Sequence, residues 1–187
     1  MTFKPDEVST ILNTKEKLRG LVKDKLLDQP WYDNAYSTYM FLSGGAIASV
    51  LLGEEPNDLD IYFTEDVKAE AFTSIIKATY IEDVKDVDEK YSTEVLIKGK
   101  LVTPRAVTMK SGAQLITKVS GSMIDVPKTF DFLHCTPVYD FHTNILYISP
   151  GAYKSIKNKQ LAANNKSVIT ASRITKFLGR GWSRGTI

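Results

Sequence analysis

The stretch FLSGGAIASVLLGEEPNDLDIYF, residues 41–63, places two glycines after an apolar run and then two aspartates one residue apart. We expect a short buried strand over residues 39–44 that runs into a glycine turn. The next apolar run ends in Gly53, which indicates a short helix over residues 45–53 closed by that glycine. Residues 58–63 alternate as a strand does, so the stretch predicts strand, turn, helix and strand in that order.

The two aspartates predict a divalent cation site. Residues two apart in a strand face the same side, so Asp58 and Asp60 project together while Leu59 and Ile61 enter the core. Two neighbouring carboxylates repel each other, and one is protonated unless a cation lies between them. Mg²⁺ prefers oxygen ligands and is commonly held by one or two carboxylates together with nucleotide phosphates.

The two glycines supply the second half of a nucleotide site. A turn without side chains at the start of a helix lets backbone N–H groups approach a phosphate. Ser43, Gly44 and Gly45 would therefore hold a triphosphate, while the aspartates hold the cation that bridges it. A Gly-Gly turn or an Asp-x-Asp pair is common by itself, but their order along this chain makes the combination more specific.

Residues 44–61 resemble the signature of the DNA polymerase β-like nucleotidyltransferase superfamily, most closely its CCA-adding and poly(A) polymerase branch. That signature reads approximately GG-x-V-R-D-x-L-L-G-x-x-P-x-D-h-D-h, where h is hydrophobic. The matching positions are Gly44, Gly45, Ile47, Leu51, Leu52, Gly53, Pro56, Asp58, Asp60 and Ile61. Ala48 and Ser49 stand where that branch carries an Arg-Asp pair, which argues against CCA addition to transfer RNA.

The resemblance implies an α+β fold, a small mixed β-sheet flanked by helices, with two Mg²⁺ or Mn²⁺ ions held by three carboxylates. The first two carboxylates map to Asp58 and Asp60, and the third usually lies on a later, neighbouring strand. We expect the third to be Asp131, a single acid in the apolar run KTFDFLHC, because an isolated carboxylate is costly to bury without a partner. The alternatives are Asp125 and Asp140.

The implied activity is metal-dependent nucleotidyl transfer from a nucleoside triphosphate such as ATP. A hydroxyl group, with Asp131 as its candidate base, would attack the α-phosphate and pyrophosphate would leave. RNA is the favoured acceptor, and a protein side chain or a small molecule stays open. A noncatalytic protein that keeps the fold and binds a nucleotide or nucleic acid is the second hypothesis, and an unrelated α+β domain with a chance match is the third.

Residues 1–150 are expected to form the catalytic domain, and residues 151–187 a basic helical extension. Within the first segment the apolar spacing predicts an N-terminal helix capped by Asp6 and weakened at Gly20. Further elements are expected as a helix over residues 64–81 and strands over 93–99, 104–112, 113–121, 128–141 and 143–149.

The extension carries a candidate phosphate-binding face. From residue 141 onward the chain has five lysines, three arginines and no acidic residue. Arg173, Lys176 and Arg180 fall on one side of a predicted helix, where they can bind the phosphates of a nucleotide or of RNA, with Trp182 available for stacking. The alternative is an amphipathic helix that closes the domain.

The composition is that of one ordinary globular domain, with 187 residues, a net charge of +2 and 43% hydrophobic residues. No apolar run approaches the roughly 20 residues that span a bilayer, so we expect a soluble, cytoplasmic protein. The single Cys135 excludes an internal disulfide and a cysteine-rich zinc site, and a buried, inert role is favoured for it. For His134 a structural role is also favoured. The short chain suggests a minimal member of the superfamily, encoded by a bacteriophage or belonging to a toxin system.

Overall fold

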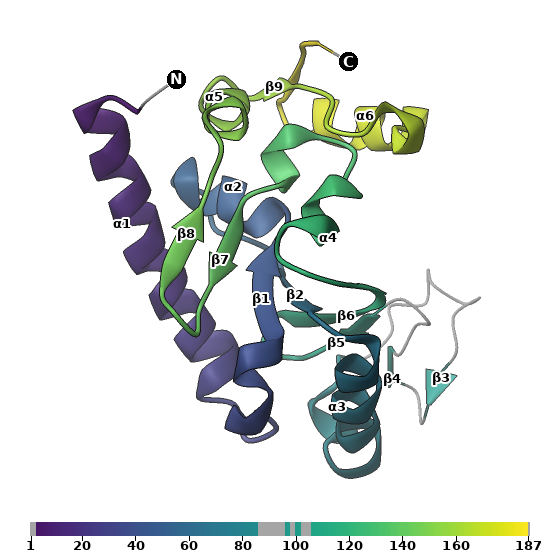
Figure 1. The fold of residues 1–187 in the computed structure, drawn as a ribbon. Helices are drawn as coiled ribbons and strands as arrows, with labels where there is room; N and C mark the ends of the chain where they lie inside the picture. Colours follow the sequence, from purple (N-terminus) through teal and green to yellow (C-terminus); the bar gives the residue numbers. More distant parts are fainter. Residues whose placement is uncertain (1–2, 86–95, 98–99, 102–105, 187) are drawn as a thin grey trace.

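The computed structural model describes residues 3–85, 96–97, 100–101 and 106–186 (Figure 1). At its centre lies a six-stranded mixed sheet with the strand order β5-β6-β2-β1-β7-β8. These strands are β1 (Met40–Ser43), β2 (Leu59–Phe63), β5 (Ala106–Thr108), β6 (Ala113–Ser120), β7 (Val138–Asp140) and β8 (Ile145–Tyr147). Strands β2 and β6 run parallel, and the other neighbouring pairs are antiparallel. This mixed sheet with its helices confirms the expected α+β fold.

Helices surround the sheet. The α-helices are α1 (Pro5–Val22), α2 (Gly45–Leu51), α3 (Asp66–Thr79), α4 (Asp125–Lys128), α5 (Pro150–Lys157) and α6 (Ala171–Leu178). A π-helical turn, Lys23–Leu27, continues α1, and 3-10 turns span Asn34–Tyr39, Ile81–Asp83, Leu133–Cys135 and Lys166–Val168. Two short strand pairs complete the secondary structure, β9 (Gln160–Leu161) parallel to β10 (Ser183–Arg184) and β3 (Leu96–Ile97) antiparallel to β4 (Lys100–Leu101).

Two details of the N-terminal helix differ from the sequence prediction. Helix α1 runs through Gly20 without a break, because its buried stripe continues on both sides of the glycine at Leu18 and Val22. Its cap is Lys4, whose backbone N–H donates to the Glu7 carboxylate, and not Asp6.

The main core lies between one face of the sheet and helices α1, α2 and α3. The stripe of α1 and its π turn reaches this cluster through Leu18, Val22 and Leu26, each fully buried, and α3 contributes Phe72 and Ile76. The opposite sheet face carries a smaller cluster of Phe41, Tyr62, Val126 and Val138. Since neighbouring residues of β1 and β2 belong to different clusters, both strands are buried on both faces.

A separate apolar cluster joins the C-terminal segment to α2. It contains Ala48 and Leu51 of α2, Tyr153 and Ile156 of α5, Leu161 of β9, Phe177 of α6, Trp182, Phe132 and Cys135. Residues after 150 therefore pack directly on the helix that follows the glycine turn, and this contact brings α6 to the same end of the sheet as the two aspartates (Figure 1). The domain boundary at residue 150 stays a prediction.

The strand expected over residues 128–141 is wrong for most of its length. Only Val138–Asp140 form a strand, β7, while Leu133–Cys135 form a 3-10 turn. The apolar side chains here do not alternate between two sheet faces, because Phe132 and Cys135 both enter the cluster beneath α6. Cys135 is buried, as expected, and its burial raises the pKa of the thiol to about 12.

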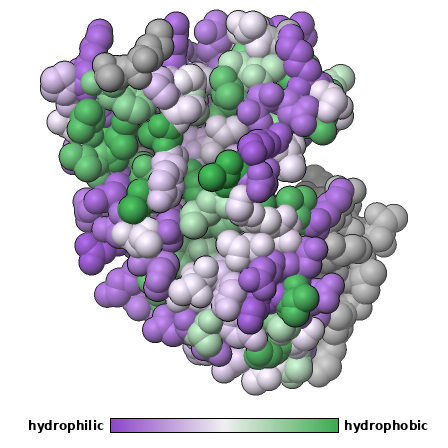
Figure 2. All heavy atoms as spheres, viewed as in Figure 1, coloured by the Kyte–Doolittle hydropathy of each residue, from purple (hydrophilic) through white to green (hydrophobic). Residues whose placement is uncertain are grey.

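The face shown in Figure 2 mixes hydrophilic and hydrophobic residues, with hydrophobic side chains gathered over α1 at the upper left. Among the described residues, no helix has both the length and the apolar character needed to cross a membrane.

Candidate nucleotide and metal site

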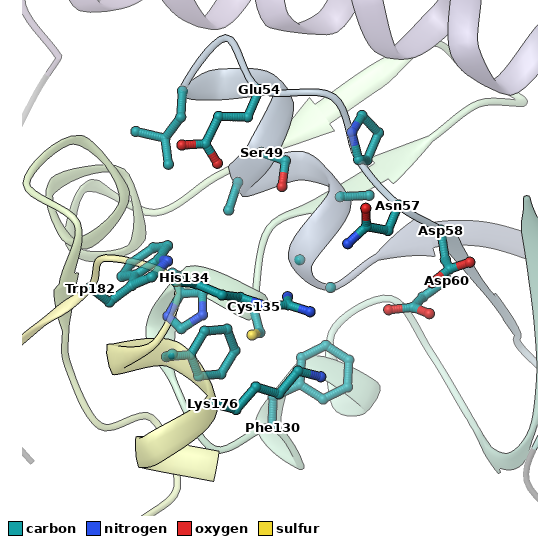
Figure 3. A pocket seen from close by; sticks show the side chains of 18 of the residues that line it. Ser49, Glu54, Asn57, Asp58, Asp60, Phe130, His134, Cys135, Lys176 and Trp182 are labelled. Carbon is teal, nitrogen blue, oxygen red and sulfur yellow. The ribbon is translucent and has the colours of Figure 1, made fainter. Parts of the chain in front are cut away.

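A cavity of about 520 Å³ opens where the glycine turn, β2 and α6 meet. Its walls come from the start of α2, the loop before β2, the segment around Asp131 and the helix α6 (Figure 3). Most of the residues singled out from the sequence lie on this cavity: Gly44, Gly45, Asp58, Asp60, Asp131, Arg173, Lys176 and Arg180. Segments that are far apart in the chain thus share one pocket.

The two aspartates form the acidic wall of this pocket. Asp58 is exposed just before β2, and Asp60 is half-buried within the strand. Figure 3 shows them next to each other at one edge of the cavity. Burial, and then the charge of Asp58, raise the pKa of Asp60 to about 6, although Lys176 and Arg173 act in the opposite direction. The ionised pair is therefore poorly compensated, which is the electrostatic condition that a bound cation relieves.

The glycine turn fits closely around Asp60. Gly44 has φ +96°, and a Cβ added to it would lie 2.8 Å from the Asp60 Oδ2 atom. Its backbone N–H donates to the Cys135 carbonyl at 3.1 Å, so this amide is already engaged. Gly45 begins α2, and an added Cβ there would meet nothing within 4 Å. Gly44 thus shapes the acidic wall, while Gly45 leaves open space beside it.

Ser43 does not line the pocket. Its side chain is fully buried in the sheet, and its hydroxyl donates to the Pro137 carbonyl at 2.8 Å. The predicted phosphate contact of Ser43 therefore has no support from its position in β1.

The basic wall of the pocket comes from α6. Thr170 caps this helix by accepting a hydrogen bond from the Arg173 N–H, and helical spacing turns Arg173 and Lys176 toward the cavity. Arg180, two residues after the helix ends at Leu178, lines the cavity as well. Figure 3 shows Lys176 extending from α6 in the direction of Asp60. Burial, and then the neighbouring charges of Arg173 and Arg180, lower the pKa of Lys176. Three cations crowded together in this way are suited to a polyanion such as a triphosphate.

Asp131 is occupied by an ion pair. Its Oδ2 atom accepts from Arg173 Nε at 2.5 Å, and its Oδ1 atom accepts from Arg173 Nη2 at 3.2 Å and from the Phe132 N–H at 3.0 Å. The carboxylate is buried, which is the position that its isolated place in an apolar run indicates. Its role as the third metal ligand stays a prediction.

The two alternatives for the third carboxylate lie away from the cavity. Asp125 is exposed and accepts hydrogen bonds from Ser122 and Lys128. Asp140, at the end of β7, accepts from the backbone N–H groups of His142 and Thr143 and so closes the turn to β8. Among the residues that the structure describes, no group of three or more His, Cys, Asp or Glu side chains is arranged to hold a metal ion.

One residue of the site escapes the sequence prediction. Gln114 of β6 lines the cavity and is the direct register partner of Asp60 on the adjacent parallel strand. Only the pairing of the strands reveals this, because an isolated glutamine in a β-branched run carries no local signal.

An aromatic group closes the far end of the pocket. The His134 ring stacks on Phe132 at a centroid distance of 5.6 Å, packs at a tilt against Trp182 at 4.0 Å, and makes an edge contact with Phe177. Within the described part of the chain, neither ring nitrogen of His134 has a hydrogen-bond partner. Burial lowers the pKa of His134 to about 3, so this histidine is neutral and packs as an aromatic residue, in agreement with the structural role favoured from the sequence.

Comparison with known proteins identifies relatives for most of the chain. Residues 12–159 match the model of a family described as "Gabija anti-defense 2 family protein". The protein "Gabija anti-defense 2" of Bacillus phage SPbetaL7 is 25% identical over 172 residues, which cover 90% of this chain and 39% of that protein. The chain therefore spans about two-fifths of the length of this relative.

Solved structures with a similar fold include CCA-adding enzymes and a transfer RNA nucleotidyltransferase. The Thermotoga maritima CCA-adding enzyme complexed with tRNA has a TM-score of 0.54 at 17% identity, over 91% of this chain and 42% of the enzyme. A tRNA nucleotidyltransferase complexed with a primer tRNA and an incoming ATP analogue has a TM-score of 0.51 at 13% identity, over 79% and 43% of the two chains. At these identities the likeness establishes the nucleotidyltransferase fold alone.

Proposed function

The chain belongs to the Gabija anti-defense 2 family, and we propose that its pocket binds a nucleoside triphosphate through a divalent cation as part of a protein that counters a host defence. The observation that carries this proposal is the opposition of charges across one cavity. Asp58 and Asp60 form one wall, and the cations on and directly after α6 form the other.

The donor atoms of the acidic wall suit Mg²⁺ or Mn²⁺. Asp58 and Asp60 offer hard carboxylate oxygens, and the raised pKa of Asp60 reflects a pair that lacks a compensating charge at close range. A bound cation would supply that charge and link the carboxylates to phosphate oxygens. Lys176 and Arg180 would bind the phosphates from the opposite side, while Arg173 is partly neutralised by Asp131.

Aromatic residues line the end of the cavity beyond the cations. Trp182 and Phe177 are buried there, 8% and 5% exposed, with the neutral His134 ring between them. A base would meet only the small exposed part of these rings, so this end offers apolar contact to a nucleotide without selecting one base.

The second candidate function is nucleotidyl transfer, which the presence of Asp60 on β2 and of Asp58 immediately before it, in a nucleotidyltransferase fold, favours. In that reaction an acceptor hydroxyl oxygen forms a bond to the α-phosphorus, the bond to the β-phosphate bridging oxygen breaks, and pyrophosphate leaves. The hydroxyl proton passes to a base or to water. RNA is the acceptor that the basic helix α6 favours. We rank nucleotide binding above nucleotidyl transfer because the described residues bring no third carboxylate to Asp58 and Asp60.

Nucleotide binding is tested by calorimetric titration of the four nucleoside triphosphates into the protein, with Mg²⁺ and with EDTA. We expect binding that requires Mg²⁺ and is lost in the double variant Asp58→Asn/Asp60→Asn. The matched control is Asp24→Asn/Asp28→Asn, which removes the same charge from two exposed positions outside the pocket, one on the π turn and one directly after it. Affinity that is unchanged by EDTA and by the pocket variant contradicts the proposal.

Transfer is tested separately with α-labelled nucleoside triphosphates, Mg²⁺ or Mn²⁺, and a mixture of cellular RNA and protein. Label that enters a macromolecule, and is lost in Asp58→Asn/Asp60→Asn, establishes the transferase and identifies its acceptor. Nucleotide binding without incorporation favours the binding function.

The link to defence is tested in cells. Bacteria carrying the Gabija defence are infected with a sensitive phage while they express this chain, its pocket variant or its surface control. Restored plaque formation by the chain and the control, but not by Asp58→Asn/Asp60→Asn, supports a nucleotide pocket that acts against the defence. Equal rescue of plaque formation by all three proteins would show that the anti-defence role does not depend on Asp58 and Asp60.

A further inference from the structure

Three side-chain positions form a row across the sheet at the pocket. Gln114 of β6 is the register partner of Asp60 of β2 on one side and of Thr108 of β5 on the other. Directly paired residues of adjacent strands project from the same face of a sheet. Gln114 therefore stands on the face of Asp60 that looks into the cavity, and it lines that cavity.

The Gln114 amide is hydrogen-bonded to Thr108. The Gln114 Nε2 atom donates to the Thr108 Oγ1 atom at 3.1 Å, and Thr108 itself is buried. With its nitrogen engaged on the β5 side, the amide has its carbonyl oxygen left as an acceptor. This oxygen is a possible ligand for a hard cation, but it carries no charge.

Gln114 occupies the position at which a site for two cations would need its third carboxylate. The resemblance to nucleotidyltransferases implies a third carboxylate on a strand next to the aspartate strand, and the strand beside β2 on this side is β6. Asp131 is held by Arg173, and Asp125 and Asp140 lie outside the cavity. The neighbour that the sheet gives to Asp60 is thus a neutral amide.

We propose that Gln114 replaces the third metal-binding carboxylate and limits the pocket to one divalent cation, held by Asp58 and Asp60. This inference rests on the proposed nucleotide site and specifies how it works. A second cation would add two positive charges where Asp58 and Asp60 supply two carboxylates and where Lys176 and Arg173 already contribute positive charge. The other acids that line the cavity are Glu54, Glu55 and Asp131, of which Glu54 is paired with Lys159 and Asp131 with Arg173. Because two cations stabilise the attacking and the leaving oxygen of a displacement, a one-cation pocket retains a nucleotide better than it transfers one.

The test counts bound manganese. The full chain is titrated with Mn²⁺ at a saturating concentration of a triphosphate with a non-hydrolysable α,β bond, and free Mn²⁺ is measured by electron paramagnetic resonance. We expect one ion per chain for the natural protein and two for Gln114→Glu, with the first ion bound at least about tenfold more tightly in the variant. Gln160→Glu, at an exposed position of β9 outside the pocket, adds the same charge and should still bind one ion.

Thermal unfolding establishes first that the variants are folded, and Gln114→Asp provides the same carboxylate on a shorter chain if Gln114→Glu does not fold. Two ions in the natural protein, or one ion in both the natural protein and a folded acidic variant, overturn the inference while leaving nucleotide binding intact. Absence of both nucleotide and manganese from the natural protein overturns the proposed function as well.

Discussion

The buried carboxylate of Asp131 and the guanidinium of Arg173 form a two-point ion pair between residues 42 positions apart in the chain. The hydrogen bonds from Arg173 to Asp131 also raise the pKa of this arginine. Because Arg173 belongs to α6, the pair fixes the helix whose cations line the pocket. Asp131 thereby acts on the site through the position of α6.

Replacing Asp131 by asparagine should lower the free energy of unfolding by about 2 kcal/mol. The value is below the usual loss for a buried pair because the Arg173 side chain is 38% exposed and partly screened by water. Urea denaturation measures the change, and Asp24→Asn, at an exposed position of the π turn, serves as the control with unchanged stability. Cation affinity should persist in Asp131→Asn. Unchanged stability together with lost Mn²⁺ binding would instead identify Asp131 as the third metal ligand.

Lys176→Gln should weaken triphosphate binding about tenfold, which corresponds to about 1.4 kcal/mol. Lys176 extends from α6 into the cavity, and its removal deletes one charge that faces the phosphates. The affinity should also become less sensitive to salt, since fewer ion pairs form on binding. Calorimetry at two salt concentrations measures both effects. Lys157→Gln, on the exposed side of α5, provides the control, and an equal loss in both variants would contradict a specific contact.

Gly44→Ala and Gly45→Ala should behave differently although they are neighbours. Gly44 has φ +96°, and its added Cβ would collide with the Asp60 carboxylate, so we expect a loss of about 1–2 kcal/mol together with loss of the cation site. Gly45 starts a helix and has open space, so alanine there should not destabilise the fold. Thermal unfolding with and without Mn²⁺ compares them. Equal stability of the two variants would show that the turn is not constrained as described.

His134 should make the protein sensitive to acid. Its folded pKa of about 3 lies below the ordinary 6.5, so between these values the unfolded chain binds a proton that the folded chain does not. The contribution of His134 to the free energy of unfolding is fully present above about pH 6.5. It falls by about 1.4 kcal/mol per pH unit as the pH is lowered from there to about pH 3.

Denaturation curves at pH 7, 6 and 5 test this dependence. His134→Phe keeps an aromatic ring among Phe132, Phe177 and Trp182 and should flatten the decline, whereas the exposed His142→Gln should leave it as steep as in the natural protein. A decline that is identical in His134→Phe would assign the acid sensitivity to other groups.

The sequence predicts those parts of the site that local spacing determines. Strand β1, the glycine turn, α2 and β2 follow from periodicity within one short stretch, although β2 begins at Leu59 and leaves Asp58 just before it. The basic face of α6 likewise follows from helical spacing, and the structure brings it to the predicted pocket.

Long-range pairing accounts for the rest. The bonds between Asp131 and Arg173 depend on how α6 docks, and the apolar run around Asp131 favours a strand by composition although it packs beneath that helix as a 3-10 turn. The position of Gln114 beside Asp60 depends on the parallel register of β2 and β6, which no local pattern determines. Ser43 is predicted to contact a phosphate because it adjoins the glycine turn. Its hydroxyl instead donates to the Pro137 carbonyl, a contact that local spacing does not predict.

The most direct measurement is a crystal structure of the protein with Mn²⁺ and a triphosphate that has a non-hydrolysable α,β bond. We predict an anomalous manganese peak between Asp58 and Asp60, with the phosphates extending from it toward Lys176 and Arg180. A nucleotide bound elsewhere, or bound in this cavity without a metal at the two aspartates, would contradict a pocket that recognises its ligand through a divalent cation.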